Sequence, residues 1–485
     1  MSKSLKDILL GVEIKVVEGP IDHAISAITF DSRKCSEGVL YVAQKGTQVD
    51  GHDFIEAAIK KGAKAIVCED LPQDRVGGIC YIQVTEAPVT LGLMAANFYD
   101  HPSKKIGLVG VTGTNGKTTT VTLLHDLFIQ LGINVGLIST VVNKIGEEEV
   151  VSTHTTPDAI QLNELLVKMH QSGCTHVFME VSSHAVVQHR IAGLSFRGGV
   201  FTNISHDHLD FHKTFKSYIL AKQGFFNLLP KDVFALSNKD DKNGAIMLQN
   251  SQAKKYFYAI KTLADYKTKV IESDFEGLSL QIDGVDFWTP LIGQFNAYNI
   301  TAVYATAVLL GQDKLDVLTA LSSIKGVSGR FQHMKINGIS GIVDYAHTPD
   351  ALENVLRTIK NIRTGNEQVI TVVGCGGDRD RSKRPLMAAI ACKLSDRILL
   401  TSDNPRMELP EFIIDEMKVG IEVNDSKKVL SIVDRREAIR TAASLAQNND
   451  ILLVAGKGHE TYQEINGERS HFDDMEELTK ALKEK

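Results

Sequence analysis

The sequence has little that would place the protein in a membrane, in an oxidising compartment or on nucleic acid. None of its six cysteines forms a CxxC pair, and such scattered cysteines are typical of reduced, mostly buried thiols in a cytosolic protein. Charges interrupt the only apolar stretch near the N-terminus, so a signal peptide is not expected. No run of about 20 apolar residues is present to span a bilayer. The net charge of −6 argues against a general nucleic-acid-binding protein. We therefore expect a cytoplasmic protein.

The sequence also lacks low-complexity segments, internal repeats and a clear GxGxxG dinucleotide motif. Its composition is ordinary for a globular protein, with 43% hydrophobic and 23% charged residues. A chain of 485 residues is too long for one hydrophobic core, and about three domains are expected at this length.

Hydrophobic patterning divides the chain into three expected α/β domains. Residues 1–103 carry short apolar runs and two helical patterns, as in a small α/β unit. Over residues 104–331, apolar strand patterns alternate with helical patterns, which predicts a parallel sheet covered by helices on both faces. A second alternating region over residues 332–485 predicts a Rossmann-like domain, and without GxGxxG we expect no dinucleotide site there.

The most informative segment is GVTGTNGKTTT at residues 110–120, between a strand pattern and a helical pattern. Its glycines allow backbone N–H groups to curl around oxyanions, and a helix N-terminus adds positive potential. Lys117 can reach the β- and γ-phosphates of a nucleotide, and the Thr118 hydroxyl can hold Mg²⁺. Val111 stands where the usual phosphate loop has its first glycine. The alternative is a tight strand-to-helix turn that binds nothing.

Two further segments offer ligands for a cation. Glu180 ends a strand pattern, at the edge where open α/β sheets bind ligands, so its carboxylate is placed to hold Mg²⁺ near phosphates. A helix-capping or core-edge glutamate is the alternative. Residues 206–212 hold three histidines, which would suit zinc, but no cysteine joins them. An oxygen-rich nucleotide site favours Mg²⁺, so we expect one histidine to supplement carboxylates around a second Mg²⁺.

These motifs together resemble the Mur ligase superfamily. The resemblance rests on GTNGKTTT at 113–120, MEVSSH at 179–184 and DHLDFH at 207–212, and it extends to DYAHTP at 344–349 and GKGHE at 456–460. The altered spacing of the phosphate loop belongs to the same pattern. Within the superfamily, the chain resembles the MurE type, which adds the third residue of the peptidoglycan peptide.

The resemblance implies an ATP-dependent carboxylate–amine ligase of peptidoglycan precursor synthesis. Such an enzyme joins meso-2,6-diaminopimelate to the γ-carboxylate of D-Glu in UDP-N-acetylmuramoyl-L-Ala-D-Glu, through an acyl phosphate. Phosphorylation supplies a leaving group that a free carboxylate lacks, and positive groups offset the charge on the transferring phosphoryl. The implied cofactors are ATP and Mg²⁺ at two sites. The implied partners are these small-molecule substrates, with no nucleic acid and no membrane, and we expect a monomer.

The resemblance also assigns roles around the nucleotide. The catalytic residues would be Lys117, Glu180, His208 and Lys222. Thr118 and Glu180 would hold the first Mg²⁺, and His208 with a carbamylated Lys222 (N6-carboxylysine) the second. The alternative for Lys222 is an ordinary surface lysine on a helix. The ATP-binding residues would be Gly113, Thr114, Asn115, Gly116, Lys117, Thr118, Thr119, Asn299, Arg330 and Asp344. For Arg330 and Asp344, a solvated ion pair is the alternative.

Two more sets would bind the other substrates. The set for the UDP-sugar peptide is Ser32, Thr155, Thr156, Ser182, Gln188 and Arg190. The set for diaminopimelate is Arg379, Asp403, Asn404, Pro405, Arg406, Gly456 and Glu460. In the family, DNPR at 403–406 marks enzymes that add meso-diaminopimelate, whose extra carboxylate an arginine can bind bidentately. In isolation, DNPR could equally be a proline-containing turn.

Two other functions stay open at this point. One is a different ligase of the superfamily, such as a folylpolyglutamate synthetase, although DSR at 31–33 and DNPR speak against it. The other is a nucleotide-dependent switch that has lost catalysis, although all four implied catalytic residues are present. Because the ATP and amino-acid determinants lie in different domains, we expect the third domain to close on the second.

Overall fold

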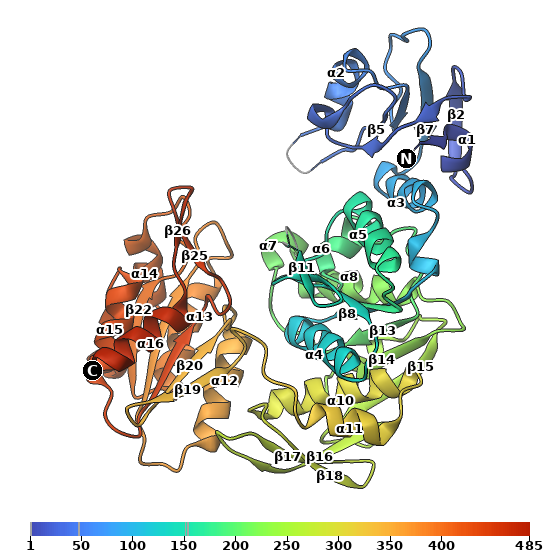
Figure 1. The fold of residues 1–485 in the computed structure, drawn as a ribbon. Coiled ribbons are helices and arrows are strands. Elements are labelled where there is room, and N and C mark those ends of the chain that lie inside the picture. The colour runs from blue at the N-terminus through green and yellow to red at the C-terminus, as the bar shows by residue number, and fades with distance from the viewer. Residues whose placement is uncertain (1, 47–48, 151, 153–154) are drawn as a thin grey trace.

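The structure is a computed structural model that describes residues 2–46, 49–150, 152 and 155–485. Figure 1 shows three successive parts along the chain, an N-terminal part in blue, a central part from cyan to yellow and a C-terminal part from orange to red. Each part is built around its own sheet, of five, eleven and six strands among the described residues. This confirms the predicted class, a mixed α/β protein of three parts. Within the described residues, no helix combines the length and the apolar character needed to cross a bilayer.

The N-terminal sheet has one antiparallel edge. In sheet order its strands are β2 (Ile14–Glu18), β7 (Cys80–Val84), β6 (Ala65–Cys68), β5 (Leu40–Val42) and β4 (Ile28–Thr29), and β2 alone runs antiparallel to its neighbour. A two-stranded sheet joins β1 (Lys3–Ser4) to β3 (Ala24–Ile25). The helices are α1 (Leu5–Ile8), η1 (Ser32–Lys34), η2 (Gly51–Phe54), α2 (Ile55–Lys60), α3 (Ala87–Phe98) and η3 (Pro102–Lys104). Helix α3 packs against the central part, and Figure 1 shows it at the junction.

The central sheet is parallel in its middle and antiparallel at both edges. In sheet order its strands are β11 (Glu148–Val150), β10 (Asn143–Ile145), β9 (Val135–Ile138), β12 (His176–Glu180), β8 (Gly107–Thr112), β13 (Gly198–Phe201), β14 (Phe234–Asn238), β15 (Lys254–Ala259), β16 (Tyr266–Ser273), β17 (Leu278–Ile282) and β18 (Val285–Thr289). Strands β9 to β16 pair in parallel, as predicted.

The antiparallel edges differ from the prediction of a parallel sheet. Strands joined by a short turn must run antiparallel, and β17 meets β18 through the two residues Asp283 and Gly284. Both have positive φ, +52° and +81°, as in the type I′ turn that an Asp-Gly pair favours. The Asp-Gly pair was therefore a hairpin signal that the sequence reasoning missed.

Helices cover both faces of the central sheet, as expected. They are α4 (Lys117–Gln130), α5 (Ala159–Gln171), α6 (Ser183–Val187), α7 (Leu209–His212), α8 (Phe215–Asn227), α9 (Gly244–Met247), α10 (Gln294–Leu309) and α11 (Lys314–Leu321). One apolar core packs α4, α10 and α11 against the sheet, and another packs α5 and α8. Helix α5 begins where the Asp158 carboxylate accepts hydrogen bonds from the backbone N–H groups of Ile160 and Gln161.

The C-terminal part is an open sheet with helices on both faces. In sheet order its strands are β19 (Gln332–Ile336), β20 (Ile339–Asp344), β24 (Ile451–Ala455), β21 (Val369–Cys375), β22 (Arg397–Ser402) and β23 (Val429–Ser431), parallel except for β19. The helices are α12 (Pro349–Ile362), α13 (Lys383–Leu394), α14 (Pro410–Lys418), η4 (Val423–Lys428), α15 (Arg435–Leu445) and α16 (Asp474–Glu484). Strands β25 (Tyr462–Ile465) and β26 (Glu468–His471) form a separate hairpin. The parallel strands and flanking helices fit the expected Rossmann-like architecture.

Candidate functional site

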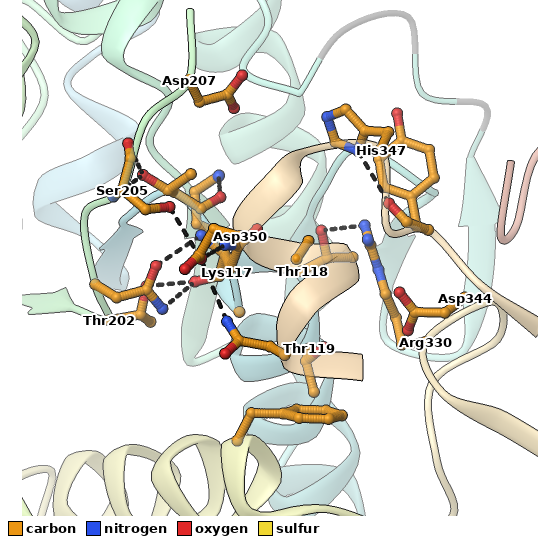
Figure 2. A pocket seen from close by; sticks show the side chains of 18 of the residues that line it. Lys117, Thr118, Thr119, Thr202, Ser205, Asp207, Arg330, Asp344, His347 and Asp350 are labelled. Carbon is orange, nitrogen blue, oxygen red and sulfur yellow. Dashed lines mark hydrogen bonds between the residues drawn. The ribbon is translucent and has the colours of Figure 1, made fainter. Parts of the chain in front are cut away.

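A cavity of about 1080 Å³ lies between the central and C-terminal parts. Its walls come from the loop between β8 and α4, from residues after β12 and β13, from α10 and α12, and from loops after β20, β21, β22 and β24. These loops follow the carboxyl ends of parallel strands, which is where open α/β sheets bind ligands. Figure 2 shows the part of this cavity around the phosphate loop.

The predicted phosphate loop has the strand–turn–helix geometry that its sequence implies. Gly113 and Gly116 have φ of +157° and +84°, and a Cβ at Gly113 would lie 1.9 Å from Thr202 Oγ1. Only glycine fits such a turn without strain. Lys117 begins α4, and its Nζ donates to the carbonyls of Gly113 and Thr114 over 2.9 and 2.8 Å. Burial lowers the pKa of Lys117, and the Glu180 carboxylate opposes this shift.

Thr118 and Glu180 meet beside the loop. Thr118 Oγ1 donates to Glu180 Oε1 over 2.9 Å, and the backbone N–H of Thr140 donates to the same oxygen over 2.8 Å. Glu180 is fully buried, and its Oε2 has no hydrogen-bond partner among the described residues. A buried carboxylate oxygen without a partner is costly. Because a hydroxyl and a carboxylate are the hard oxygen ligands that Mg²⁺ takes, these two residues fit a Mg²⁺ ion. The helix-capping alternative for Glu180 finds no support in these contacts.

Lys222 is buried beneath the phosphate loop. Its side chain comes from α8, is 1% exposed, and donates from Nζ to Gly113 O over 2.7 Å. Nζ also lies 4.8 Å from the centroid of the Tyr218 ring. Burial lowers the pKa of Lys222 well below its ordinary value, and the Lys117 charge acts in the same direction. The surface-lysine alternative is therefore wrong, and burial favours the uncharged amine more than it would be favoured in an exposed lysine.

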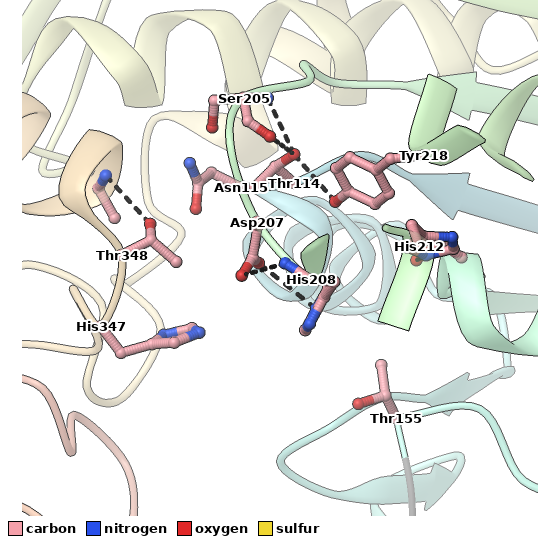
Figure 3. A network of polar contacts seen from close by, with 12 residues as sticks. Thr114, Asn115, Thr155, Ser205, Asp207, His208, His212, Tyr218, His347 and Thr348 are labelled. Carbon is pink, nitrogen blue, oxygen red and sulfur yellow. Dashed lines mark hydrogen bonds and ion pairs between the residues drawn. The ribbon is translucent and has the colours of Figure 1, made fainter. Parts of the chain in front are cut away.

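The histidine-rich segment lies beside Tyr218, whose ring centroid is 6.3 Å from that of His208 and 5.0 Å from that of His212 (Figure 3). His208 has φ of +54°, and its Nε2 lies 3.4 Å from Asp207 Oδ2. Burial lowers the pKa of His208 to about 4, so its ring is neutral near pH 7, the form that binds metals. His212 turns away to Ser183, with Nε2 2.9 Å from Oγ. Across the described residues, no cluster of three or more His, Cys, Asp or Glu is placed to hold a metal. A metal at His208 would therefore need ligand oxygens from elsewhere, such as a phosphate or a carbamate.

Three predicted ATP-binding residues lie at the junction of the central and C-terminal parts. Asn299 Nδ2 donates to Asn296 Oδ1 over 3.0 Å. Arg330 lies 4.4 Å above the Tyr345 ring and donates to Thr118 Oγ1 over 3.2 Å. Asp344 accepts from the backbone N–H of Phe331 over 2.7 Å, and burial raises its pKa to about 6. The solvated ion pair considered for Arg330 and Asp344 is therefore wrong.

The sequence reasoning missed Asp350, which links the two parts directly. This residue of α12 accepts from Asn115 Nδ2 over 2.8 Å and from Ser205 Oγ over 3.0 Å (Figure 2). Asn115 belongs to the phosphate loop, so the C-terminal part contacts the loop through a carboxylate. Asp350 directly follows the DYAHTP motif, and this position was the only feature of the sequence that pointed to a role for Asp350.

Of the six residues predicted for the UDP-sugar peptide, four line the cavity and two do not. Ser182 caps α6 by accepting from Ala185 N, while Arg190 donates to Thr156 O over 2.7 Å and to Gln188 Oε1 over 2.9 Å. The cavity walls include Thr155, Thr156, Ser182 and Arg190. Gln188 and Ser32 are not among the lining residues, and Ser32 belongs to η1 of the N-terminal part.

The predicted diaminopimelate residues come from three neighbouring strands. Arg379 follows β21, the DNPR segment follows β22, and Gly456 and Glu460 follow β24. All of these residues line the cavity except Pro405. The DNPR segment is therefore a turn after a strand, as its alternative interpretation assumed, and it is also part of the cavity wall.

Lys457 is a buried cation below this region that the sequence analysis did not single out. Asn404 Nδ2 donates to Glu460 Oε2 over 2.7 Å, and the fully buried Lys457 donates to that oxygen and to Asn404 Oδ1, each over 3.2 Å. Burial, with the Asp403 charge acting in the same direction, raises the pKa of Glu460. Lys457 lies within the GKGHE motif, but its sequence position did not reveal that it supports Glu460.

Comparison with protein families finds Mur ligase models along most of the chain. "Mur ligase family, catalytic domain" matches residues 24–99, "Mur ligase middle domain" matches 111–307, and "Mur ligase, glutamate ligase domain" matches 329–458.

Individual proteins match over nearly the full length. The UDP-N-acetylmuramoyl-L-alanyl-D-glutamate–2,6-diaminopimelate ligase of Cytophaga hutchinsonii is 57% identical over 472 residues, 97% of each chain. The enzyme of the same name from Phocaeicola vulgatus is 52% identical over 475 residues, 98% of each chain. A solved structure of a ligase of this name is 33% identical, covers 99% of each chain and superposes with a TM-score of 0.69.

Proposed function

The chain belongs to the Mur ligase family, and from this premise we propose that it is an ATP-dependent ligase of peptidoglycan precursor synthesis. It joins meso-2,6-diaminopimelate to the γ-carboxylate of D-Glu in UDP-N-acetylmuramoyl-L-Ala-D-Glu. One observation carries the proposal: the phosphate loop and the DNPR segment face the same cavity. The names of the similar ligases support the choice of substrates.

In the proposed reaction, the γ-phosphoryl of ATP passes to the D-Glu carboxylate, giving ADP and an acyl phosphate. The amine of diaminopimelate then attacks the acyl carbon, loses a proton, and displaces phosphate to leave the amide. Lys117 and the loop N–H groups would hold the phosphates. Thr118 and Glu180 would hold one Mg²⁺, and His208 with a carbamylated Lys222 a second. Bound Mg²⁺ would neutralise charge on the transferring phosphoryl.

The environment of Lys222 favours its carbamylation. A neutral lysine amine attacks CO₂, forms an N–C bond and releases a proton, so a cation becomes an anionic oxygen ligand. An ordinary lysine is neutral in only about 1 in 3,000 molecules at pH 7. Burial lowers the pKa of Lys222 well below 10.5, which raises this reactive fraction.

Arg406 is our candidate for amino-acid selection. Diaminopimelate differs from lysine by a carboxylate at its far end, and a guanidinium binds a carboxylate with two parallel hydrogen bonds. With lysine bound, the guanidinium would face no carboxylate, which weakens binding by about 1–3 kcal/mol. Asp403, Asn404, Arg379, Gly456 and Glu460 would form the rest of the amino-acid pocket, with Glu460 facing the distal ammonium.

We further propose domain boundaries near residues 103 and 331, and a monomer in the cytoplasm. All six cysteines are free and buried, as expected of a protein from a reducing compartment. The ATP and amino-acid determinants belong to different parts of the chain, so we infer that the C-terminal part closes on the central part during catalysis.

The test measures phosphate release and amide product with ATP, Mg²⁺, the UDP-sugar peptide and either meso-diaminopimelate or L-lysine. We expect product with diaminopimelate, and equal or better turnover with lysine would refute the assigned selectivity. Lys222→Ala should reduce turnover about 100-fold or more, because it removes an oxygen ligand beside the phosphates. A small carboxylate such as formate should restore part of that loss.

The matched control is Lys216→Ala, which removes an exposed lysine from the same helix. It should leave turnover within about twofold, as surface substitutions usually do. Two results would favour the other functions. Folate-stimulated ATP turnover would indicate a folylpolyglutamate synthetase. Nucleotide binding without any amide product would indicate a switch protein.

A further inference from the structure

Two loops of the C-terminal part are packed against one another beside the cavity. Residues 376–380 follow β21, and residues 403–408 follow β22. Gly377 N donates to Asn404 O over 2.9 Å, which joins the loops through their backbones. The side chain of Arg406 adds a second link, because its Nη1 donates to Gly377 O over 2.7 Å. The direction of the Arg406 guanidinium therefore depends on where the 376–380 loop is held.

Glu408 and Arg384 hold that loop. Glu408 Oε1 accepts from the backbone N–H of Asp378 over 2.6 Å, and the two Glu408 oxygens accept from Arg384 over 2.8 and 2.9 Å. Arg384 is fully buried and also donates to Gly376 O over 3.2 Å. Asp378 and Arg406 have φ of +52° and +54°. Side-chain-bearing residues adopt such φ values at a cost, so surrounding contacts must maintain them.

We propose that Glu408 and Arg384 form a clamp that positions Arg406 and thereby sets the preference for an amino acid with a distal carboxylate over lysine. This rests on the proposed function. Arg406 lines the cavity, whereas Glu408 and Arg384 are not among its lining residues, so the clamp acts through Arg406. Among the described residues, only Gly377 accepts from the Arg406 guanidinium, which leaves its other donors for a ligand.

The geometry explains why the clamp affects selectivity. A guanidinium engages a carboxylate bidentately only when its plane faces that carboxylate. Releasing the 376–380 loop moves the carbonyl that orients Arg406, so the contact with the distal carboxylate weakens. Lysine has no distal carboxylate to make this contact, so its binding should weaken little. None of the residues proposed for ATP belongs to these two loops or to the clamp, so the KM for ATP should not change.

Glu416 provides a matched control. It lies on α14 and accepts from Arg384 over 2.6 Å, and its side chain is 30% exposed against 23% for Glu408. Within the described part of the chain its hydrogen bonds go to Arg381 and Arg384, not to the 376–380 loop. Glu408→Ala and Glu416→Ala each remove one carboxylate from Arg384, but only Glu408→Ala releases Asp378 N.

The experiment measures kcat and KM for meso-diaminopimelate, L-lysine and ATP in the full chain, with thermal melting as a check on folding. Glu408→Ala should raise the KM for diaminopimelate about tenfold and reduce its kcat/KM advantage over lysine by a similar factor, as the partial loss of a charge-assisted contact predicts. The KM for ATP should stay within twofold. Glu408→Gln should recover part of the selectivity, because its amide oxygen can still accept from Asp378 N. Glu416→Ala should keep the wild-type preference.

Two results would overturn the clamp. One is an unchanged diaminopimelate preference in folded Glu408→Ala, and the other is an equal loss in Glu408→Ala and Glu416→Ala. If Glu408→Ala does not fold, Glu408→Asp carries the same test, since it keeps the charge but shortens the reach to Asp378 N. Its KM for diaminopimelate should then rise at least threefold, and no rise would also overturn the clamp. Failure of the proposed function is separate, because the wild-type protein would then make no amide from diaminopimelate.

Discussion

The buried ion pair between Arg435 and Asp474 allows a sharp stability prediction. Both side chains are 0% exposed. Arg435 donates to the two Asp474 oxygens over 2.8 and 2.7 Å, and to the carbonyls of Ser402 and Ala455 over 3.2 and 3.1 Å. Ser402 directly precedes the DNPR segment, and Ala455 directly precedes Gly456. The pair therefore supports both chain segments that carry amino-acid determinants.

Asp474→Asn keeps the size of the side chain but leaves the Arg435 cation buried without a counter-charge. Breaking such a pair costs about 3–5 kcal/mol of unfolding free energy. That corresponds to a roughly 150- to 5,000-fold increase in the opening equilibrium of the C-terminal part. Replacing both partners, as Arg435→Met with Asp474→Leu, removes both charges and should recover most of this loss, because well-packed apolar pairs often substitute neutrally.

Hydrogen exchange of the amides in β21, β22 and β24 measures this opening. The single tryptophan, Trp288, lies in β18 of the central sheet, so its fluorescence reports a different part of the molecule and should show an unchanged urea midpoint. Two results would refute this reasoning: a loss of unfolding free energy below about 1 kcal/mol in Asp474→Asn, or an equal loss in the double variant. Either result would mean that burying an unpaired charge does not destabilise the C-terminal part.

Two further predictions concern pH and the selector arginine. Burial lowers the pKa of His347 to about 4 and that of His459 to about 3, so the unfolded chain binds protons that the folded chain does not. From about pH 6.5 toward pH 4, these two histidines should together lower the free energy of unfolding by about 3 kcal/mol per pH unit. Urea unfolding at pH 7, 5.5 and 4.5 measures the change, and greater stability on acidification would contradict it. Arg406→Leu should raise the KM for diaminopimelate about 10- to 100-fold, since a hydrogen bond to a charged group contributes roughly 1.5–3 kcal/mol. Steady-state kinetics with an unchanged KM for both amino acids would exclude Arg406 as the selector.

Features encoded by neighbouring residues were predictable from the sequence. The phosphate loop is one, because its glycines, Lys117 and Thr118 are adjacent in the chain and the strand and helix around it carry distinct apolar periods. The alternation of strands and helices in the central and C-terminal parts is another. The antiparallel pairing of β17 with β18 had an equally local signal in Asp283 and Gly284. This Asp-Gly pair predicts a hairpin, and the sequence analysis did not use it.

Other features depend on residues that are distant in the sequence. Nothing near Lys222 indicates that it is buried below Gly113, which is 109 positions away. The contact of Asp350 with Asn115 spans 235 positions, and the links among Arg384, Glu408 and Asp378 join three separate segments. The structure also leaves Ser32 and Gln188 outside the cavity lining, although the motif match had grouped them with Ser182 and Arg190.

The sequence by itself determined which chemical groups the protein carries and which local turns hold them, because backbone propensity, glycine content and hydrophobic period act over a few residues. Only the tertiary structure decided which of these groups are buried, which share a cavity and which have a counter-charge. Desolvation and charge pairing depend on everything that packs around a side chain, and most of those neighbours come from elsewhere in the chain.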